Sequence, residues 1–417
     1  MKRKATVLTF TIVLVVLSLL VASVPSLNAT DEAPQLQWSK TYGTYEGYSV
    51  IQTTDGGYAV SGVNATYGVH GYNGFYPICI KTDASGEVQW AKTYSEFGVS
   101  GNAYSIVQTT DSGYILSTHG GHLLKLYNDG NVQWNKTYGL LLGQSFAIQA
   151  SDGGYVLIGS VSNSVNRDDI ILVKTDDTGV LLWNKTFSTG TSSSDVFARA
   201  VMETKDGGYA LTGEWGNSYF WLATTDSEGN LLANQTYNVS NMTSYSESFA
   251  STADGGYILA GGDGSNAWLV KTDAQGNMQW KRSYAGRSFV SVAQTVDGGY
   301  IAAEGNTLVK LDTSGNVQWD TGNLLSDKGL YSVIVTEDGG YAVAGGSEYN
   351  VWLGKFAPES ATSPNETAPF PTIWIAIGVI ILTVVGIGLL VYLRKRKKKP
   401  KRLQLRSVIK RYFKENP

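Results

Sequence analysis

The chain has 417 residues, of which 42% are hydrophobic, 12% aromatic and only 16% charged, and it contains a single cysteine. This composition excludes a disulfide scaffold, a cysteine-based zinc site, an iron–sulfur cluster, and collagen-like or disordered classes. The net charge of −3 conceals a segregation, because residues 1–29 carry +3, residues 30–371 carry −17 and residues 394–417 carry +11. The asymmetry indicates regions on different sides of a membrane, and the acidic middle argues against nucleic-acid binding.

The N-terminus has the composition of a secretory signal peptide. Three basic residues at positions 2–4 precede an apolar run over residues 5–24, and small residues follow as far as Ala29. This pattern predicts a signal peptide over residues 1–29, while the length of the apolar run leaves an uncleaved anchor as an alternative. Either reading places the following chain outside the cell.

The middle of the chain repeats one unit seven times. Each unit carries the motif Asp-Gly-Gly-Tyr, once as Asp-Ser-Gly-Tyr, with its Asp at positions 55, 111, 152, 206, 254, 297 and 338. A second motif, Lys-Thr-Asp-x-x-Gly-x-x-x-Trp or a looser copy, follows each of the first six, as over residues 81–90. Each unit therefore predicts four strands: A before the Asp-Gly-Gly turn, B after it, a nearly all-apolar C, and D after the second turn.

The glycines of the first turn predict a local conformation. The second glycine is present in all seven copies, whereas Ser112 once replaces the first. We therefore expect the second glycine to occupy a position with positive φ at the end of a three-residue hairpin loop. The Asp of the turn is expected to cap it through backbone hydrogen bonds and not to bind calcium, since no copy matches a calcium-binding loop.

Seven four-stranded units predict an all-β fold, a seven-bladed β-propeller over residues 30–356. The ends of the repeat supply a second argument. Residues 36–42 form a strand D with no A, B or C before it, and the last unit stops after its strand C at residues 351–355. The first strand is thus expected to complete the last blade and close the ring. An open solenoid is the alternative.

These motifs resemble those of two groups of propellers. The Asp-Gly-Gly-Tyr units resemble the repeat propellers of archaeal and bacterial cell-surface proteins, and the second motif is similar to the tryptophan-docking motif of quinoprotein-like propellers. That resemblance implies tryptophans packed between neighbouring blades, at Trp38, Trp90, Trp134, Trp183, Trp280 and Trp319. Ala233 departs from the motif in the fourth copy. The adjacent cysteines and calcium site of quinone-dependent dehydrogenases are missing, so no cofactor is implied.

A binding site is expected on the face that carries the B–C loops and the D-to-A connections. Three of these segments are long and variable, residues 63–74, 160–169 and 239–246, and variable loops on a regular scaffold usually carry binding. The candidate ligand-binding residues there are His70, His119, His122, Trp215, Asp168 and Asp169. The histidines are either a metal site shared by two blades or exposed polar residues, with no metal as the favoured reading. Trp215 either stacks on a sugar or peptide or plugs the channel.

Catalysis is not expected, and no catalytic residue is assigned. The sequence has no Gly-x-Ser-x-Gly elbow, no His-Glu-x-x-His and no phosphate-binding loop. A carboxylate pair on the loops, acting as a hydrolase or lyase, remains the alternative.

Glycosylation is predicted by seven Asn-x-Ser/Thr sequons in the exported part. They begin at Asn64, Asn135, Asn184, Asn234, Asn238, Asn241 and Asn365.

The C-terminal part predicts a membrane anchor. Residues 357–371 are rich in Pro, Ser and Thr and read as a stalk, and residues 372–393 form an uncharged apolar stretch long enough to cross a bilayer. Six consecutive basic residues then begin a tail over residues 394–417, a positive-inside signal.

The sequence therefore predicts a single-pass type I protein of the cell membrane with an extracellular propeller. Its expected function is recognition of a surface protein, a glycan or another extracellular ligand. A structural component of the cell envelope, packing laterally without a specific ligand, is the second hypothesis.

Overall fold

The computed structural model describes residues 33–43, 46–68, 71–96, 101–138, 142–163, 167–188, 196–215, 219–240 and 245–359. All of them belong to one compact unit, residues 29–360. The predicted signal peptide, transmembrane helix and basic tail, and all but the start of the stalk, lie outside the described residues and stay predictions. Within the described ranges, no helix is long and apolar enough to span a bilayer.

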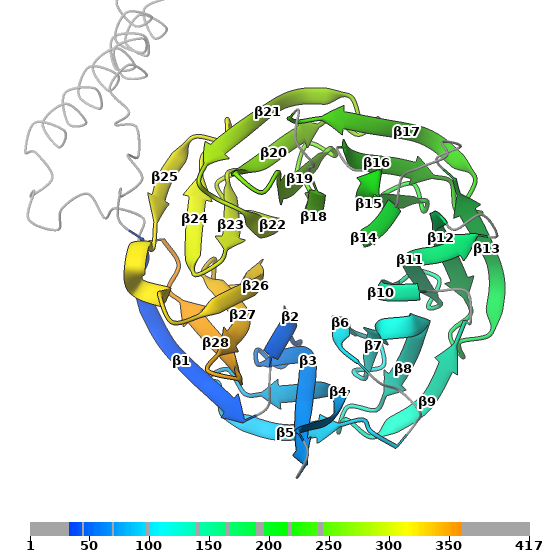
Figure 1. The fold of residues 1–417 in the computed structure, drawn as a ribbon, viewed down its shortest axis with the longest axis vertical. Coiled ribbons are helices and arrows are strands. Elements are labelled where there is room, and N and C mark those ends of the chain that lie inside the picture. The colour runs from blue at the N-terminus through cyan, green and yellow to red at the C-terminus, as the bar shows by residue number, and fades with distance from the viewer. Residues whose placement is uncertain are drawn as a thin grey trace, which may run out of the picture. The chain divides into compact units, whose positions relative to one another are not determined.

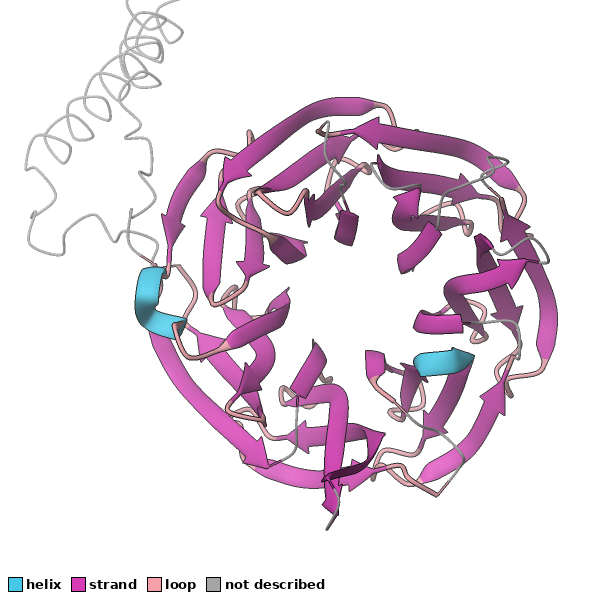
Figure 2. Cartoon of the chain, in the orientation of Figure 1, coloured by secondary structure: helices cyan, strands magenta, loops and turns pink. Residues whose placement is uncertain are grey.

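The described chain forms seven four-stranded antiparallel sheets arranged around one axis (Figure 1). Strands make up almost all of its regular structure, and the two helical segments coloured in Figure 2 are the short 3-10 helices η1 (His119–Gly121) and η3 (Gly322–Leu325). The predicted seven-bladed β-propeller is thus confirmed. Blades are numbered here in the order of their Asp-Gly-Gly-Tyr motifs.

Each blade contributes one strand to each of four concentric positions. The innermost, A strands are β2 (Glu46–Gln52), β6 (Ala103–Gln108), β10 (Leu142–Gln149), β14 (Val196–Glu203), β18 (Tyr245–Ser251), β22 (Phe289–Gln294) and β26 (Gly329–Val335). The B strands are β3 (Tyr58–Gly68), β7 (Tyr114–Thr118), β11 (Tyr155–Asn163), β15 (Tyr209–Trp215), β19 (Tyr257–Gly262), β23 (Tyr300–Glu304) and β27 (Tyr341–Ser347).

The outer half of each blade is built in the same way. The C strands are β4 (Gly71–Thr82), β8 (His122–Leu126), β12 (Arg167–Thr175), β16 (Tyr219–Thr225), β20 (Asn266–Thr272), β24 (Thr307–Leu311) and β28 (Asn350–Phe356). The outermost, D strands are β5 (Val88–Thr93), β9 (Val132–Thr137), β13 (Leu181–Phe187), β17 (Leu231–Asn238), β21 (Met278–Ala285), β25 (Val317–Asp320) and, in blade 7, β1 (Leu36–Gly43).

The first strand closes the ring, as predicted. β1 pairs antiparallel with β28, with Leu36 opposite Phe356, and the Ala357 amide donates a 2.9 Å hydrogen bond to the Gln35 carbonyl. The chain therefore enters and leaves the propeller at neighbouring points. Both points lie on the face that carries the A–B and C–D turns, called here the turn face. The opposite face carries the B–C and D-to-A connections and is called the loop face.

The turn glycines correct one prediction. The first glycine of the motif has positive φ, for example +79° at Gly56, and Ser112 adopts the same conformation at +64°. The second glycine does not. It is required because a Cβ on Gly57 would lie 2.1 Å from the Thr82 carbonyl oxygen, and the six equivalent glycines meet strand C just as closely. Close backbone approach, and not backbone dihedral, therefore explains its presence in all seven copies.

The two repeated motifs meet within a blade through an ion pair. The Lys81 ammonium lies 2.8 Å from Asp55 and 2.7 Å from the Thr82 carbonyl, with the lysine side chain only 4% exposed. Asp55 also accepts a 3.1 Å hydrogen bond from the Gly57 amide, which is the expected cap. The same ion pair forms in five other blades, at Lys125–Asp111, Lys174–Asp152, Lys271–Asp254, Lys310–Asp297 and Lys355–Asp338.

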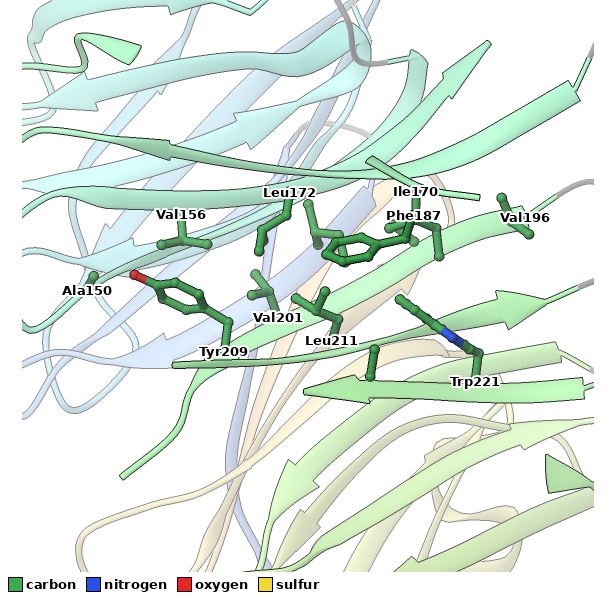
Figure 3. Packing of buried hydrophobic residues seen from close by; sticks show 13 residues of the cluster. Ala150, Val156, Ile170, Leu172, Phe187, Val196, Val201, Tyr209, Leu211 and Trp221 are labelled. Carbon is green, nitrogen blue, oxygen red and sulfur yellow. The ribbon is translucent and has the colours of Figure 1, made fainter. Parts of the chain in front are cut away.

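The hydrophobic core lies between blades. One cluster joins Val156 and Leu172 of blade 3 to Val201, Leu211 and Trp221 of blade 4, as Figure 3 shows. Six other clusters of the described residues are built in the same style from adjoining strands. A blade buries its sheet faces only against its neighbours, so the stability of each depends on an unbroken ring.

The tryptophans of the D strands lie at these junctions. Trp38 of blade 7 packs edge-on against Tyr58 of blade 1, with ring centroids 5.6 Å apart. The same contact recurs at five further junctions, as Trp90–Tyr114, Trp134–Tyr155, Trp183–Tyr209, Trp280–Tyr300 and Trp319–Tyr341. Each tryptophan thus joins two neighbouring blades.

A hydrogen bond from strand A also ties one blade to the next. The Gln108 amide oxygen of blade 2 accepts a 2.8 Å bond from the Thr54 backbone amide in the turn of blade 1. Gln52 does the same for the Glu337 amide, 2.8 Å away, so this bond also spans the closure between blades 7 and 1.

Candidate binding site at the ring axis

The predicted long loops of blades 1 and 3 are extended β-hairpins for most of their length. β3 and β4 stay paired from Tyr58–Thr82 out to Gly68–Gly71, and β11 and β12 from Tyr155–Thr175 out to Asn163–Arg167. The prediction that residues 63–74 and 160–169 are loops is therefore wrong, because backbone pairing continues along them. The brief connection predicted at residues 304–306 is a turn between β23 and β24.

The predicted ligand-binding residues do not form one site. His70 lies outside the described residues. His119 is exposed in η1, and His122 opens β8 with its Nδ1 buried and no hydrogen-bond partner in the described structure. No group of three or more His, Cys, Asp and Glu side chains in the described ranges is placed to hold a metal ion.

The remaining candidates lie in strands and not in loops. Trp215 is the last residue of β15, opposite Val196. Asp168 and Asp169 belong to β12, and Asp169 is buried. Asp169 is thus placed as a part of the blade 3 sheet, and its side chain is not displayed at the surface.

Another set of residues is aligned at one position of the innermost strands, and several of its members contact one another. The position lies seven residues before each turn Asp, where strand A begins on the loop face. Around the ring it holds Tyr48, Tyr104, Ser145, Arg199, Glu247, Val290 and Tyr331. This position changes in size and charge from blade to blade, whereas the two that follow it hold mostly serine and then only apolar residues.

Three consecutive blades place tyrosines there and form an aromatic arc. The rings of Tyr48 and Tyr331 meet at 61° with centroids 5.2 Å apart, and those of Tyr48 and Tyr104 are 5.7 Å apart. Phe146 of blade 3 extends the arc, 6.3 Å from Tyr104. The four rings are partly exposed, so they present an aromatic surface at the inner strands. The aromatic arc is defined here as these four residues.

Hydrogen bonds hold the tyrosines in place. Tyr48 donates a 2.6 Å bond to the Glu46 carboxylate, and the Asn102 amide contacts the hydroxyls of both Tyr48 and Tyr104 at 3.2 and 3.3 Å. Burial, reinforced by the bond to Glu46, raises the pKa of Tyr48 well above its ordinary value. The hydroxyl therefore stays protonated and keeps its role as donor.

Blades 4 and 5 place a charged cluster beside the arc. Arg199 donates to Glu214 through Nη2 at 2.6 Å and Nε at 3.1 Å, and to the Gln144 amide oxygen through Nη1 at 2.8 Å. Glu247 is farther away, 3.5 Å from Arg199 Nη1. Gln144 also hydrogen-bonds Tyr104, so it links the arc to the cluster. This charged cluster is defined as Arg199, Glu214 and Glu247.

The two carboxylates of the cluster are in different electrostatic situations. Burial raises the pKa of Glu247, Arg199 lowers it, and the nearby Glu214 charge raises it again, with a net upward shift. Glu214 accepts both strong bonds from Arg199. Glu247 is therefore the less compensated of the two negative charges.

A second ion cluster lies on the loop side of blade 6. Arg287 contacts Glu304 at 2.8 Å and Asp320 at 2.5 Å, and so ties β23 to β25. The Oε2 atom of Glu304 is buried and has no hydrogen-bond partner among the described residues. Burial raises the pKa of Glu304, and Arg287 opposes the shift.

The turn face carries two grooves between blades. They measure about 360 and 300 Å³ and lie between blades 1 and 2 and between blades 2 and 3. Their walls are the repeated structural residues, including the Asp55–Lys81 pair in one and Asp111–Lys125 in the other. Since the same residues already pair with one another, we assign these grooves to blade packing.

The sequons are distributed over several strands. Asn184, Asn234 and Asn238 are exposed on the outermost strands β13 and β17, and Asn135 is partly buried on β9. Asn64, on β3, donates a 3.1 Å hydrogen bond to the Thr93 hydroxyl. Asn241 and Asn365 lie outside the described residues.

The aromatic arc and most of the charged cluster were missed by the sequence reasoning. A signal for them exists. Once the seven copies are aligned on the turn Asp, the start of strand A stands out by its variation, and the positions that follow it repeat. The buried lysine of the second motif was missed as well, although it recurs in six copies and Thr224 replaces it only in blade 4.

Comparisons with known proteins support the fold. No family model matches the chain, and no curated protein matches its sequence. Three solved structures are similar in fold. BamB from Moraxella catarrhalis has a TM-score of 0.47 at 12% identity, over 78% of this chain and 100% of that chain. YCF48 bound to D1 peptide has a TM-score of 0.50 at 13% identity, over 80% of this chain and 99% of that chain. The Dos1 propeller has a TM-score of 0.52 at 10% identity, over 78% of this chain and 98% of that chain.

At these identities, the likeness to YCF48 and to the Dos1 propeller supports the propeller architecture alone. The resemblance to Asp-Gly-Gly-Tyr repeat proteins and the cell-surface origin stay predictions.

Proposed function

We propose that this chain is a membrane-anchored extracellular binding module that recognises its partner on the loop face, at the ring axis. The observation that carries the proposal is the aromatic arc joined to the charged cluster, at the start of strands whose later positions repeat. Variable side chains on a rigid, repetitive scaffold are typical of recognition surfaces. YCF48, a propeller of similar fold, was solved with D1 peptide, which is a precedent for a polypeptide ligand on this architecture. A glycan is the other ligand class retained.

The position of the chain ends supports the choice of face. Gln35 and Ala357 are hydrogen-bonded to each other on the turn face, and both predicted membrane segments lie beyond them in the sequence. The anchor over residues 372–393 therefore connects to the turn face. The loop face lies opposite the points where the chain enters and leaves the propeller, which supports its assignment as the binding face.

Binding is favoured over catalysis by the chemistry of the carboxylates that come together. Glu214 and Glu247 share Arg199 as their cation, and Glu214 accepts two bonds from it. Glu214, which is committed to this pair, is poorly placed to exchange a proton with a substrate. The proposal includes no enzymatic activity, catalytic residue, metal or cofactor.

A blocking experiment tests the choice of face. The native Cys79 is fully buried, so a single introduced cysteine can be modified selectively. Asp327→Cys on the loop face and Asp177→Cys on the turn face are each coupled to a 5 kDa polyethylene glycol. Full-length protein in nanodiscs is then passed over immobilised cell-surface extract of the source cells.

Modification at position 327 is expected to lower retention about tenfold, because the polymer covers the loop face. Modification at position 177 is expected to leave it unchanged. Equal retention of both conjugates, or loss only at position 177, would place the partner elsewhere and refute the proposal.

A lateral packing role is the second candidate, and one observation favours it. Exposed aliphatic side chains occur at the starts of the outermost strands of blades 3 and 4, with Leu232 70% exposed. The others are Leu181, Leu182 and Leu231 on these strands and Val180 just before β13. Exposed apolar side chains that gather in one region can mark an association surface. Sedimentation of Leu182→Ser with Leu232→Ser against the native protein tests it, since a structural role requires self-association that the double variant abolishes.

The exposed sequons fit a glycoprotein. Sugars are expected at Asn184, Asn234 and Asn238, where the asparagine is exposed on an outermost strand. Intact-mass analysis of protein from the source cells, before and after deglycosylation, checks this expectation.

A further inference from the structure

We propose that the loop-face site binds a partner segment bearing lysine or arginine side chains, with the aromatic arc, Glu46 and Glu247 as the groups that receive the positive charge. The inference rests on the proposed binding function and names the chemistry of its ligand.

The first argument is the charge balance of the cluster. Arg199 is one cation between two carboxylates, so Arg199, Glu214 and Glu247 together carry one net negative charge. The hydrogen bonds of Arg199 go to Glu214 and Gln144, which leaves Glu247 with a single ionic contact to Arg199 at 3.5 Å. A partly buried carboxylate that lacks a full counter-ion is stabilised by an arriving cation. The upward shift of the Glu247 pKa, caused first by burial, has the same origin.

The second argument is the aromatic arc itself. Cations bind the faces of tyrosine and phenylalanine rings, and the attraction grows as the site becomes drier. The protein already contains such a contact beside the arc, because the guanidinium of Arg199 lies 5.9 Å from the Phe197 ring centroid. Tyr48 and Tyr331 meet at 61°, so their ring planes face in different directions and form two walls of a corner.

A second carboxylate lies at the base of this corner. Glu46 accepts a hydrogen bond from the Tyr48 hydroxyl, and it has no cationic partner within 4.0 Å in the described part of the chain. Aromatic faces with a nearby carboxylate are the environment in which a lysine or arginine side chain loses least on leaving water.

The electrostatic field of the whole domain also favours a positively charged ligand. Residues 30–371 carry a net charge of −17, which attracts cationic segments and repels anionic ones. A neutral glycan gains nothing from this field. Charge dependence of binding therefore separates a cationic peptide from a glycan at the same site.

The experiment uses full-length protein in nanodiscs of zwitterionic lipid and measures fluorescence anisotropy at physiological salt. The probes are labelled (Gly-Lys)4, (Gly-Gln)4 and (Gly-Glu)4 peptides and a labelled neutral oligosaccharide. The lysine peptide is expected to bind saturably and about tenfold more tightly than the glutamine peptide. The glutamate peptide is expected not to bind.

Two variants with matched controls locate the site. Glu247→Gln and Tyr48→Leu are each expected to weaken binding of the lysine peptide about tenfold. Glu337→Gln, on the turn face, makes the same charge change, and Tyr127→Leu removes a tyrosine that is 52% exposed at the turn-face end of β8. Both controls are expected to bind like the native protein. Urea midpoints of all four verify that the ring stays folded.

Equal binding of the lysine and glutamine peptides, or equal loss in Glu247→Gln and Glu337→Gln, would overturn the inference. Preference for the oligosaccharide would overturn it in favour of a glycan. In these cases the blocking experiment at positions 327 and 177 still decides the proposed function, because that result does not depend on the charge of the ligand.

Discussion

The junction between blades 4 and 5 differs from the other six junctions of the ring. Six times a D-strand tryptophan packs against the motif tyrosine of the next blade, but here Ala233 takes its place. Tyr257 instead has Phe249, of its own blade, 6.1 Å away. One hydrogen bond of the other junctions persists here, because the Tyr237 hydroxyl donates a 2.6 Å hydrogen bond to the Gly276 carbonyl. The ring therefore closes through redundant contacts, and one of them can be dispensed with.

Blade 4 also departs from the repeat at the position of the buried lysine and at the start of its inner strand. Thr224 occupies the place of the buried lysine, so Asp206 has no lysine partner within its blade. The same blade contributes Arg199 and Glu214 to the charged cluster. The comparison separates two kinds of residue: those that repeat hold the ring together, and those that vary at the start of the inner strands form the surface for which we propose a recognition role.

The largest expected effect comes from removing the tryptophan at one of the six junctions that have one. Trp280→Ala at the junction of blades 5 and 6 deletes the contact with Tyr300, whose ring centroid is 6.0 Å away. We expect a loss of about 3 kcal/mol in the free energy of unfolding, because a large partly buried side chain leaves a cavity. Urea denaturation measures it, with Leu232→Ala as the exposed control. A loss below about 1 kcal/mol would mean that all junctions resemble the one at Ala233.

A pair of glycine variants separates the effect of the tryptophan contact on stability from the effect of backbone strain. Gly130 and Gly276 occupy equivalent C–D turns with φ of +76° and +80°. A Cβ on Gly130 would lie 2.6 Å from the Trp90 ring, whereas on Gly276 its nearest neighbour is the flexible Gln235 side chain at 3.3 Å. Gly276→Ala is expected to cost about 1 kcal/mol of backbone strain, and Gly130→Ala about 2 kcal/mol more through the clash. Equal losses in urea denaturation would contradict the role given to the tryptophan.

The ion pairs within the blades give a further contrast. Asp55→Asn removes the counter-ion of the buried Lys81, which keeps its bond to the Thr82 carbonyl. Because Asp55 is half exposed, water screens part of the interaction, and we expect a loss of about 1 kcal/mol. The matched change Asp206→Asn, in the blade without the lysine, is expected to cost less than half of that. Thermal unfolding of both variants checks the difference.

The same pair predicts a dependence on acid. Burial alone would raise the pKa of Asp55, but bonds from Lys81, Thr53 and the Gly57 amide outweigh it and lower the pKa to about 2. A carboxyl whose folded pKa lies below its unfolded value, about 3.9, stabilises the fold above that value and loses this contribution as the pH falls toward 2. Stability is thus expected to be flat from pH 8 to 5 and to fall below pH 4. The difference between native protein and Asp55→Asn should vanish near pH 2, and a difference that persists there would refute the ion pair.

The architecture could be predicted from the sequence because repetition amplifies weak local signals. Seven aligned copies gave the blade count, the strand order and the closure by residues 36–42. What could not be predicted depends on contacts between residues that are far apart in sequence, either within a copy or between copies. The close approach of the second glycine to strand C involves Thr82, which is 25 positions away from Gly57 in sequence. The aromatic arc likewise joins Tyr48 to Tyr331 across the closure, a contact that no local pattern contains.

The smallest expected effect concerns the bond from strand A to the preceding turn. Gln52→Ala removes the acceptor of the Glu337 amide across the closure of the ring, and a single partly exposed hydrogen bond contributes about 0.5–1 kcal/mol. Ser251 holds the equivalent position in blade 5, where a glutamine would face the Lys205 amide of blade 4. Ser251→Gln is therefore expected to add a bond of similar strength at the irregular junction, with Ser251→Ala as the neutral control. Urea midpoints that move in opposite directions for Gln52→Ala and Ser251→Gln would show that the irregular junction is built on the same geometry as the other six and lacks only the side chains that complete it.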